Sequence, residues 1–215
     1  MPLLILIAAI LAMLYLVWFC YRGPSWLKSI VKTMSVLLLA VVVIMSGGPL
    51  WLTVALTLCA VGDYFLSRGS EITFMAGVGA FGAGHLAYVA AFLTHDAADP
   101  GRIGEHALWV AALVVFGIAM AGLLFSRAGS LRFAVLGYIP VIMSMALAAL
   151  ALPAIGPLAL VLPAALSFLV SDTVLSLEEF VVPLGHRLHR LTPFVVWPTY
   201  WLAQLGFLIG LGGVL

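Results

Sequence analysis

Long apolar stretches, separated by short polar or glycine- and proline-containing segments, make up almost the whole chain. Eight of them are close to the roughly 20 residues that a helix needs to cross the hydrocarbon of a bilayer. They span residues 3–20, 29–46, 50–67, 72–94, 106–125, 132–151, 155–177 and 194–214. Turn signals such as Arg22-Gly23-Pro24 and Gly47-Gly48-Pro49 stand between them. The pattern predicts an all-α integral membrane protein with eight transmembrane helices.

Composition agrees with this picture and narrows the function. The 215 residues are 65% hydrophobic and 8% charged, against about a quarter charged in a typical soluble domain. We therefore expect residues 1–215 to form a single transmembrane domain. No basic stripe is present for phosphates to follow, so we expect no nucleic-acid partner. Cys20 and Cys59 lie inside apolar runs, where a thiol serves packing more often than chemistry.

The distribution of positive charge predicts the orientation. Eight of the nine Lys and Arg residues lie on the odd-numbered connections, and Arg102 is the exception. Because cytoplasmic connections carry the excess of positive side chains, both termini are expected outside. The first run has no basic stretch before it, so we interpret it as a retained helix rather than a signal peptide. A compact chain with no targeting extension is typical of a bacterial inner membrane.

A short sequence echo relates the two halves of the chain. The segment from Asp63 to Ser67 and the segment from Asp172 to Ser176 both read Asp-x-x-Leu-Ser, on the third and seventh predicted helices. Helices four apart run in the same direction, which fits a parallel duplication of a four-helix unit. A chance match in an apolar chain is the alternative.

Two carboxylates lie inside predicted transmembrane helices, where burying a charged side chain is energetically unfavourable. An ionisable side chain at the centre of a membrane helix costs about 2.5–3.5 kcal/mol on insertion scales. Asp63 and Asp172 lie roughly 7 and 9 Å inside the predicted cytoplasmic boundary, so their depths agree. Because a purely structural carboxylate there would need a buried partner, both are the leading candidates for function.

Other polar side chains are predicted in the same leaflet. Spacings of three and four residues place His85 with Tyr88, and Tyr200 with Gln204, on common helix faces. Since lipid cannot satisfy such groups, we expect one polar chamber opening toward the cytoplasmic side. Simpler alternatives are a Lys32 that snorkels to the interface, tyrosines such as Tyr64 that lie in the core or at the interface, and a His85 that only bridges two helices.

In order along the chain, these residues resemble the YhhN family of eight-helix membrane lysoplasmalogenases. The resemblance covers about residues 28–210 and departs from the family's frequent Lys-Pro at one place, where Thr33 follows Lys32. It is carried by Lys32, Gly62-Asp63, Phe81 through His85 to Tyr88, Ser171-Asp172-x-x-Leu175 and Tyr200-x-x-x-Gln204.

The resemblance implies hydrolysis of the vinyl-ether bond of a lysoplasmalogen, a lysophospholipid that enters from the membrane, to a fatty aldehyde and a glycerophospho-headgroup. Such a bond is cleaved by protonation of its outer alkene carbon and capture of the resulting oxocarbenium ion by water. One carboxyl group must donate the proton while another stays ionised, a division of labour that glycosidases also use. Asp63 and Asp172 would divide these roles, in either order, and no cofactor is required.

The remaining candidates would surround the substrate. Lys32 or Arg68 would hold the phosphate, while Tyr64, Tyr88, Ser171, Tyr200, Gln204 and His85 would line the binding site and place the glycerol oxygens and water. A metal-dependent hydrolase using Asp63, Asp172 and His85 is one alternative. A proton-coupled transporter that uses the same aspartates is another, and a structural scaffold is a third.

Overall fold

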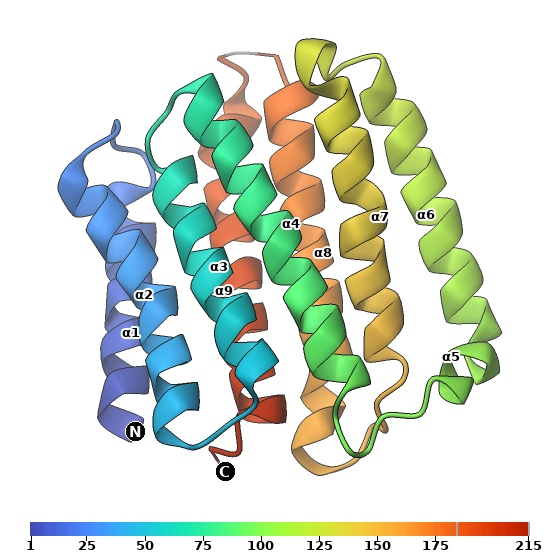
Figure 1. The fold of residues 1–215 in the computed structure, drawn as a ribbon. Coiled ribbons are helices and arrows are strands. Elements are labelled where there is room, and N and C mark those ends of the chain that lie inside the picture. The colour runs from blue at the N-terminus through green and yellow to red at the C-terminus, as the bar shows by residue number, and fades with distance from the viewer. Residues whose placement is uncertain (184, 215) are drawn as a thin grey trace.

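The computed structural model describes residues 1–183 and 185–214, and this part of the chain is helical with no strand. Eight long helices lie side by side along the axis of the bundle, and consecutive helices run in opposite directions (Figure 1). They are α1 (Pro2–Leu14, extended by the π-helical turn η1, Tyr15–Phe19), α2 (Trp26–Met45), α3 (Leu50–Leu66), α4 (Glu71–Leu93), α6 (Ala107–Phe125), α7 (Arg132–Ala149), α8 (Val161–Phe180) and α9 (Pro193–Leu211).

Seven of these helices in the described chain are long and apolar enough to cross a membrane. The remaining one, α3, is apolar but has only 17 residues. The two ends of the chain lie at the same end of the bundle (Figure 1), as an even number of long helices requires. The all-helical prediction is therefore confirmed, together with seven helices of membrane-spanning character.

The connections differ from the expected loops at two places. The polar stretch before residue 106 contains a short helix, α5 (Gly101–Glu105). At the other end of the bundle, α8 continues to Phe180 and carries Glu178 and Glu179 in its last turn, and a 3₁₀ turn (Arg187–Arg190) precedes α9. Hydropathy could not mark this extension, because a charged last turn ends an apolar run before it ends a helix.

Local sequence explains where helices begin and end. The Ser25 hydroxyl accepts a hydrogen bond from the backbone N–H of Lys28 and so caps α2, and Ser70 and Thr73 form a reciprocal capping box at α4. Glycines with positive φ, 69° at Gly47 and 73° at Gly69, follow α2 and α3 and turn the chain back, a conformation that glycine adopts without steric cost.

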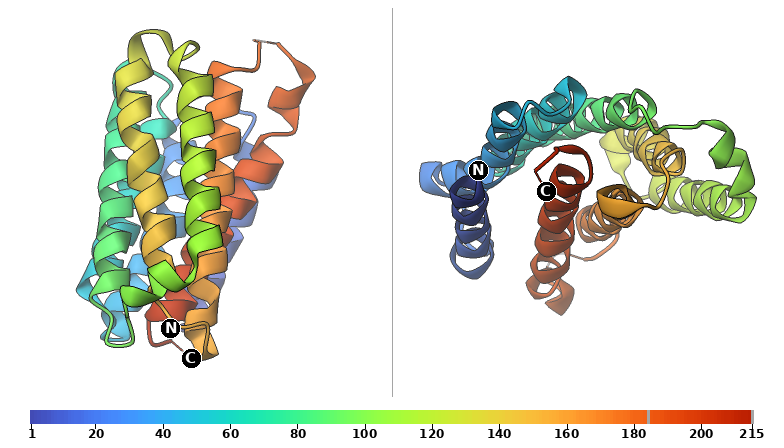
Figure 2. Two further views of the ribbon diagram at one scale, coloured as in Figure 1. Left: turned by 90° about the vertical axis from the view of Figure 1, so that its right-hand side faces the viewer. Right: turned by 90° about the horizontal axis from the view of Figure 1, so that it is seen from below.

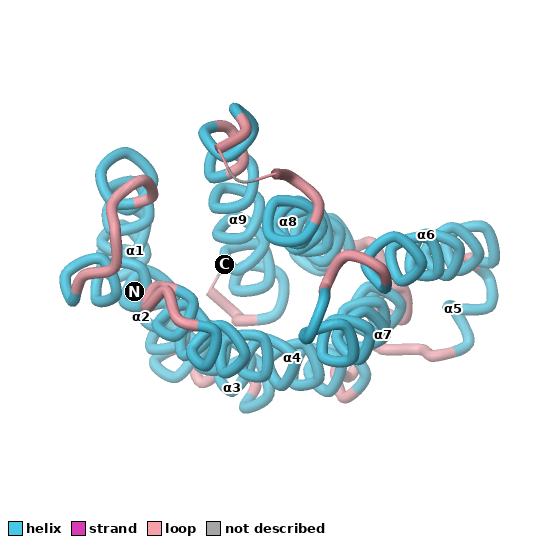
Figure 3. Tube along the Cα trace, turned by 90° about the horizontal axis from the view of Figure 1, so that it is seen from above, coloured by secondary structure: helices cyan, strands magenta, loops and turns pink. Residues whose placement is uncertain are grey.

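In cross-section the helices form an arc around an inner pair. Seen from above, α2, α3, α4, α7 and α6 follow one another along the arc, and α8 and α9 lie on its concave side (Figure 3). The view from below shows the same arrangement (Figure 2, right). Side chains of α3, α4, α7, α8 and α9 that point into this interior are thereby brought together from distant parts of the sequence.

Helix pairing in the first half of the chain repeats in the second. Helix α1 packs on α2 as α6 packs on α7, α2 on α3 as α7 on α8, and α3 on α4 as α8 on α9. Between the halves, the last helix of each half contacts the second helix of the other half: α4 contacts α7, and α9 contacts α2. This is the pairing expected of two four-helix units related by an approximate twofold axis.

Small residues bring the central helices close together. A Cβ atom on Gly62 of α3 would lie 2.6 Å from a ring carbon of Phe81 on α4, and one on Gly206 of α9 would lie 2.8 Å from the Cβ of Ala164 on α8. Helices in a membrane associate largely through such close packing, since lipid is as apolar as they are. The Gly62 contact fixes α3 immediately beside Asp63.

Candidate active site

A cavity of about 990 Å³, counted out to its open mouth, lies among α2, α3, α4, α6, α7, α8 and α9. The enclosed part that the centres of water-sized molecules can occupy is about 120 Å³. Most of the wall is aliphatic or aromatic. The polar side chains that line it are Lys32, Asp63, Tyr138, Ser171, Asp172, Thr173, Ser176, Glu179 and Tyr200.

Asp63 lies in the wall of this cavity as half of a buried ion pair. Its side chain is 1% exposed, and the Lys32 ammonium is 3.1 Å from Oδ1. The Tyr200 hydroxyl donates to Oδ2 at 2.7 Å. Lys32 also faces the rings of Tyr15 and Trp197, at 5.6 and 5.5 Å from their centroids, positions that favour a cation. Both oxygens of Asp63 are therefore engaged, Oδ1 by the ammonium and Oδ2 by the tyrosine hydroxyl.

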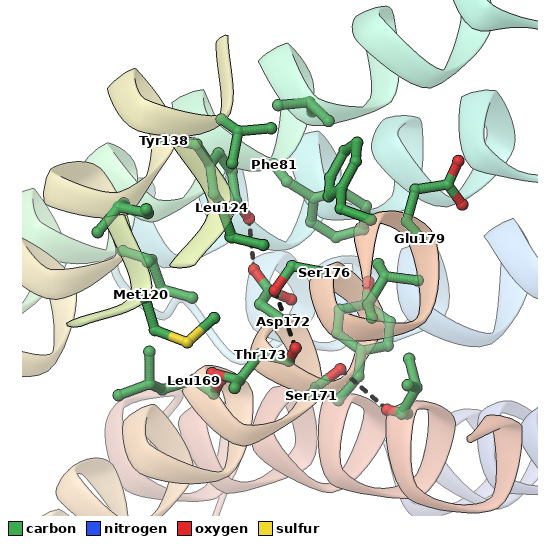
Figure 4. Close-up of a pocket in the computed structure, with 18 of the residues that line it drawn as sticks. Phe81, Met120, Leu124, Tyr138, Leu169, Ser171, Asp172, Thr173, Ser176 and Glu179 are labelled. Carbon is green, nitrogen blue, oxygen red and sulfur yellow. Dashed lines mark hydrogen bonds between the residues drawn. The ribbon is translucent and has the colours of Figure 1, made fainter. Parts of the chain in front are cut away.

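Asp172 has neutral neighbours instead of a cation. The Tyr138 hydroxyl donates to Oδ2 at 2.5 Å, and Nε2 of His85 lies 2.8 Å from the Tyr138 oxygen and 3.3 Å from Oδ2. Figure 4 shows the side chains of Tyr138 and Asp172, which both line the cavity, pointing toward each other. Both contacts go to Oδ2. The Asp172 side chain is 17% exposed, and within the described chain Oδ1 has no hydrogen-bond partner.

The histidine behind this contact is fully buried, and its Nδ1 has no partner within the described chain. A hydrogen on Nδ1 would be an unpaired buried donor, which is costly. The geometry thus favours a neutral imidazole with its hydrogen on Nε2, donating to the Tyr138 oxygen while Tyr138 donates to Asp172. His85, Tyr138 and Asp172 form a short chain of hydrogen bonds that ends at the cavity.

The two carboxylate clusters correspond under the helix pairing described above. Lys32 and Tyr138 are each the seventh residue of their helix, α2 and α7. Tyr200 comes from α9 and His85 from α4, the last helix of each half. Each aspartate is thus bound by the helix before it and by the last helix of the other half. The main difference is electrostatic, because a lysine in one cluster stands where a tyrosine stands in the other.

The other predicted site residues lie in three different places. Ser171 lines the cavity, and its hydroxyl donates to the carbonyl of Val196 on α9 at 3.0 Å. Tyr88 and Gln204 are fully buried outside the cavity lining, where the Tyr88 hydroxyl donates to Oε1 of Gln204. Tyr64 does not line the cavity and packs against Trp26. The structure therefore brings Lys32, Asp63, Ser171, Asp172 and Tyr200 to one cavity, with His85 directly behind it.

Sequence reasoning missed Tyr138. Its position carried a usable signal, because it follows Arg132 by six residues, just as Asp172 precedes Glu178 by six. A hydroxyl at that depth, on a helix that the charge pattern predicts to start at the cytoplasmic boundary, is expected level with the aspartates. In the structure it is the closest polar neighbour of Asp172.

A second hollow lies at the mouth of the cavity. The two share Leu66, Phe74, Glu179 and Phe180, and the mouth hollow adds Glu71 and Arg127. Its walls come from the α3–α4 and α6–α7 connections, at the end of the bundle opposite the chain termini (Figure 1). Arg68, a candidate for the phosphate, lies outside both hollows, with its guanidinium 4.4 Å from the Trp26 ring centroid.

The described residues contain no group of three or more His, Cys, Asp or Glu side chains that could hold a metal ion. Of the three ligands considered for a metal-dependent hydrolase, His85 and Asp172 lie together in one cluster. The third, Asp63, lies in the other cluster and is paired with Lys32.

Comparison with protein families shows which family the chain belongs to. The YhhN family matches residues 27–211, which is most of the chain and includes Asp63, Asp172 and the side chains bonded to them. No curated protein and no solved structure shows significant similarity.

Proposed function

The chain belongs to the YhhN family, and we propose that it is a lysoplasmalogenase that hydrolyses the vinyl-ether bond of a lysophospholipid inside the cavity. One observation supports this most directly: two aspartates reach a single apolar cavity, one of them paired with a lysine and the other with neutral partners. Vinyl-ether hydrolysis needs such a difference between two carboxyl groups.

Asp172 is the acid in this proposal. Because Tyr138 donates to Oδ2, Oδ1 is left to carry a proton, and Asp172 is one of the residues that line the cavity. Transfer of this proton to the outer alkene carbon forms a C–H bond and leaves an oxocarbenium ion. The Asp172 carboxylate formed in the step keeps its hydrogen bond from Tyr138, and hydrogen bonds to a charged acceptor are the stronger kind.

Asp63 stays ionised in every step. Its negative charge, compensated by Lys32 in the resting site, stabilises the oxocarbenium ion and orients the water that attacks it. The water adds its oxygen to the cation and gives up one proton, which restores the protonated Asp172. The resulting hemiacetal breaks into a fatty aldehyde and a glycerophospho-headgroup, so one water is consumed and no cofactor takes part.

The mouth hollow suits the headgroup. Arg127 offers a cation for the phosphate. It takes the place of Arg68, and of Lys32, because the Lys32 ammonium is already paired with Asp63.

In keeping with the charge distribution, we place this end of the bundle on the cytoplasmic side, with eight crossings and both termini outside. A bacterial inner membrane is the proposed location, and the paired clusters agree with a duplicated four-helix unit.

Purified protein incubated with a lysoplasmalogen and with the matched acyl lysophospholipid provides the test. We expect aldehyde from the first and no fatty acid from the second. Asp63→Asn and Asp172→Asn should each lower aldehyde release by at least about 100-fold, since a positioned acid or base contributes roughly 10²–10⁴-fold. Tyr64→Phe is the matched control and should be near wild type. Turnover retained in both aspartate variants would refute the mechanism, and no product from either lipid would favour transport.

A further inference from the structure

The cavity has an apolar side between α6 and α8. Helix α6 packs on α7 and α5 and makes no comparable contact with α8 in the described chain. Seen from above, α6 and α8 lie on two sides of α7 (Figure 3). Side chains of all three helices line the cavity. The three helices therefore form a groove with α7 as its floor, on the outer side of the bundle where lipid would lie.

The groove offers hydrocarbon surface and leads to Asp172. Thr173 and Ser176 of α8 face it, but their hydroxyls donate to carbonyls of their own helix, at 2.7 and 2.8 Å. Across from them stand three apolar side chains of α6, spaced over roughly 12 Å of helix. These are Phe116, Met120 and Leu124. Figure 4 shows Met120, Leu124 and Leu169 around one side of the Asp172–Tyr138 contact.

We propose that this groove binds the hydrocarbon chain of a single-chain phospholipid and is the lateral path by which that lipid enters from the bilayer. The assignment rests on the proposed function for the identity of the polar end. A chain attached at the scissile bond must leave Asp172 through an apolar channel, and the groove is continuous with that point. Met120 suits such a wall, because its unbranched thioether adapts to chains of different shape.

Binding is tested apart from catalysis with an ester-linked lysophosphatidylethanolamine that carries a diazirine in its chain. The proposed reaction does not cleave this ester, so the photolabel reports where the chain lies. In nanodiscs we expect label on peptides from α6 and α8, displaced by unlabelled lysophosphatidylethanolamine. Label spread evenly over lipid-facing helices such as α1 would overturn the proposal.

Substitutions at Met120 supply the matched variants. Met120→Trp should reduce displaceable labelling about tenfold and raise KM for a long-chain lysoplasmalogen more than for a short-chain one. Met120→Ala, which widens the groove, should weaken displaceable labelling less than Met120→Trp does. Ile118→Trp is the control, because Ile118 lies on the same helix and is 67% exposed away from the groove. Normal labelling without vinyl-ether hydrolysis would refute the proposed function alone. Normal long-chain kinetics in an active Met120→Trp protein would refute the groove alone.

Discussion

Replacing Lys32 with methionine keeps most of the side-chain volume and removes the ammonium 3.1 Å from Asp63. The carboxylate is 1% exposed, so water cannot replace the lost partner, and the Tyr200 hydrogen bond alone remains. Removing one member of a buried ion pair typically costs about 3–5 kcal/mol. For a chain of this length, we expect the unfolding midpoint to fall by roughly 6–20 °C, at about 2–4 °C per kcal/mol.

Thermal unfolding in detergent, followed by near-ultraviolet circular dichroism, measures the effect. Lowering the pH should narrow the difference from wild type, because a proton on Asp63 removes the unpaired charge in the variant. Lys28→Met is the matched control: Lys28 precedes Lys32 by one turn and donates to backbone carbonyls, so its loss should cost about 1 kcal/mol. The double variant Lys32→Met, Asp63→Asn should recover much of the midpoint without activity.

The reasoning fails if Lys32→Met unfolds at the wild-type temperature at neutral pH. It also fails if the difference from wild type does not depend on pH. Either result would mean that Asp63 carries no charge in the folded protein. The division of roles between the two aspartates would then have to be abandoned.

Three further predictions concern other contacts. Tyr138→Phe should lower aldehyde release roughly 10- to 150-fold with little change in unfolding midpoint, since a hydrogen bond to a charged group is worth about 1.5–3 kcal/mol; wild-type rates would contradict this. Gly62→Ala should destabilise the fold by about 1–3 kcal/mol through overpacking, whereas Gly79→Ala, with open space around it, should not. The hydrogen bond to the Glu178 carboxylate raises the pKa of His189. The contact therefore stabilises the loop fully at pH values below the ordinary imidazole pKa. This stabilisation is lost as the pH rises through the raised pKa of His189 in the folded protein. Glu178→Gln should lower the His189 pKa in an NMR titration, and an unchanged value would contradict the contact.

The helices were predictable from the sequence because hydrocarbon thickness imposes a length on each apolar run. The distances of Asp63 and Asp172 from the charged ends of their helices predicted similar levels, and both side chains line one cavity. The direction in which a side chain faces was not predictable. In a soluble helix, polarity separates the core face from the solvent face, but here both the lipid side and the core side are apolar.

Tyr64 and Tyr138 illustrate this limit. Both are tyrosines near the same boundary, yet Tyr64 packs against Trp26 and Tyr138 bonds to Asp172. Only the rotation of α3 and α7 about their axes decides between these outcomes, and close packing such as that at Gly62 sets it. Sequence spacing also paired His85 with Tyr88 on one helix face, whereas the structure assigns them to different clusters.

The correspondence between Lys32 and Tyr138 has a consequence for assembly. Two identical four-helix subunits related by a twofold axis would have to carry the same residue at that position, because an isologous arrangement repeats every contact. Two lysines would hold both carboxylates charged, and two tyrosines would leave neither with a fixed counter-ion. Joining the halves in one polypeptide lifts that constraint, so that symmetric architecture can carry an asymmetric distribution of protons.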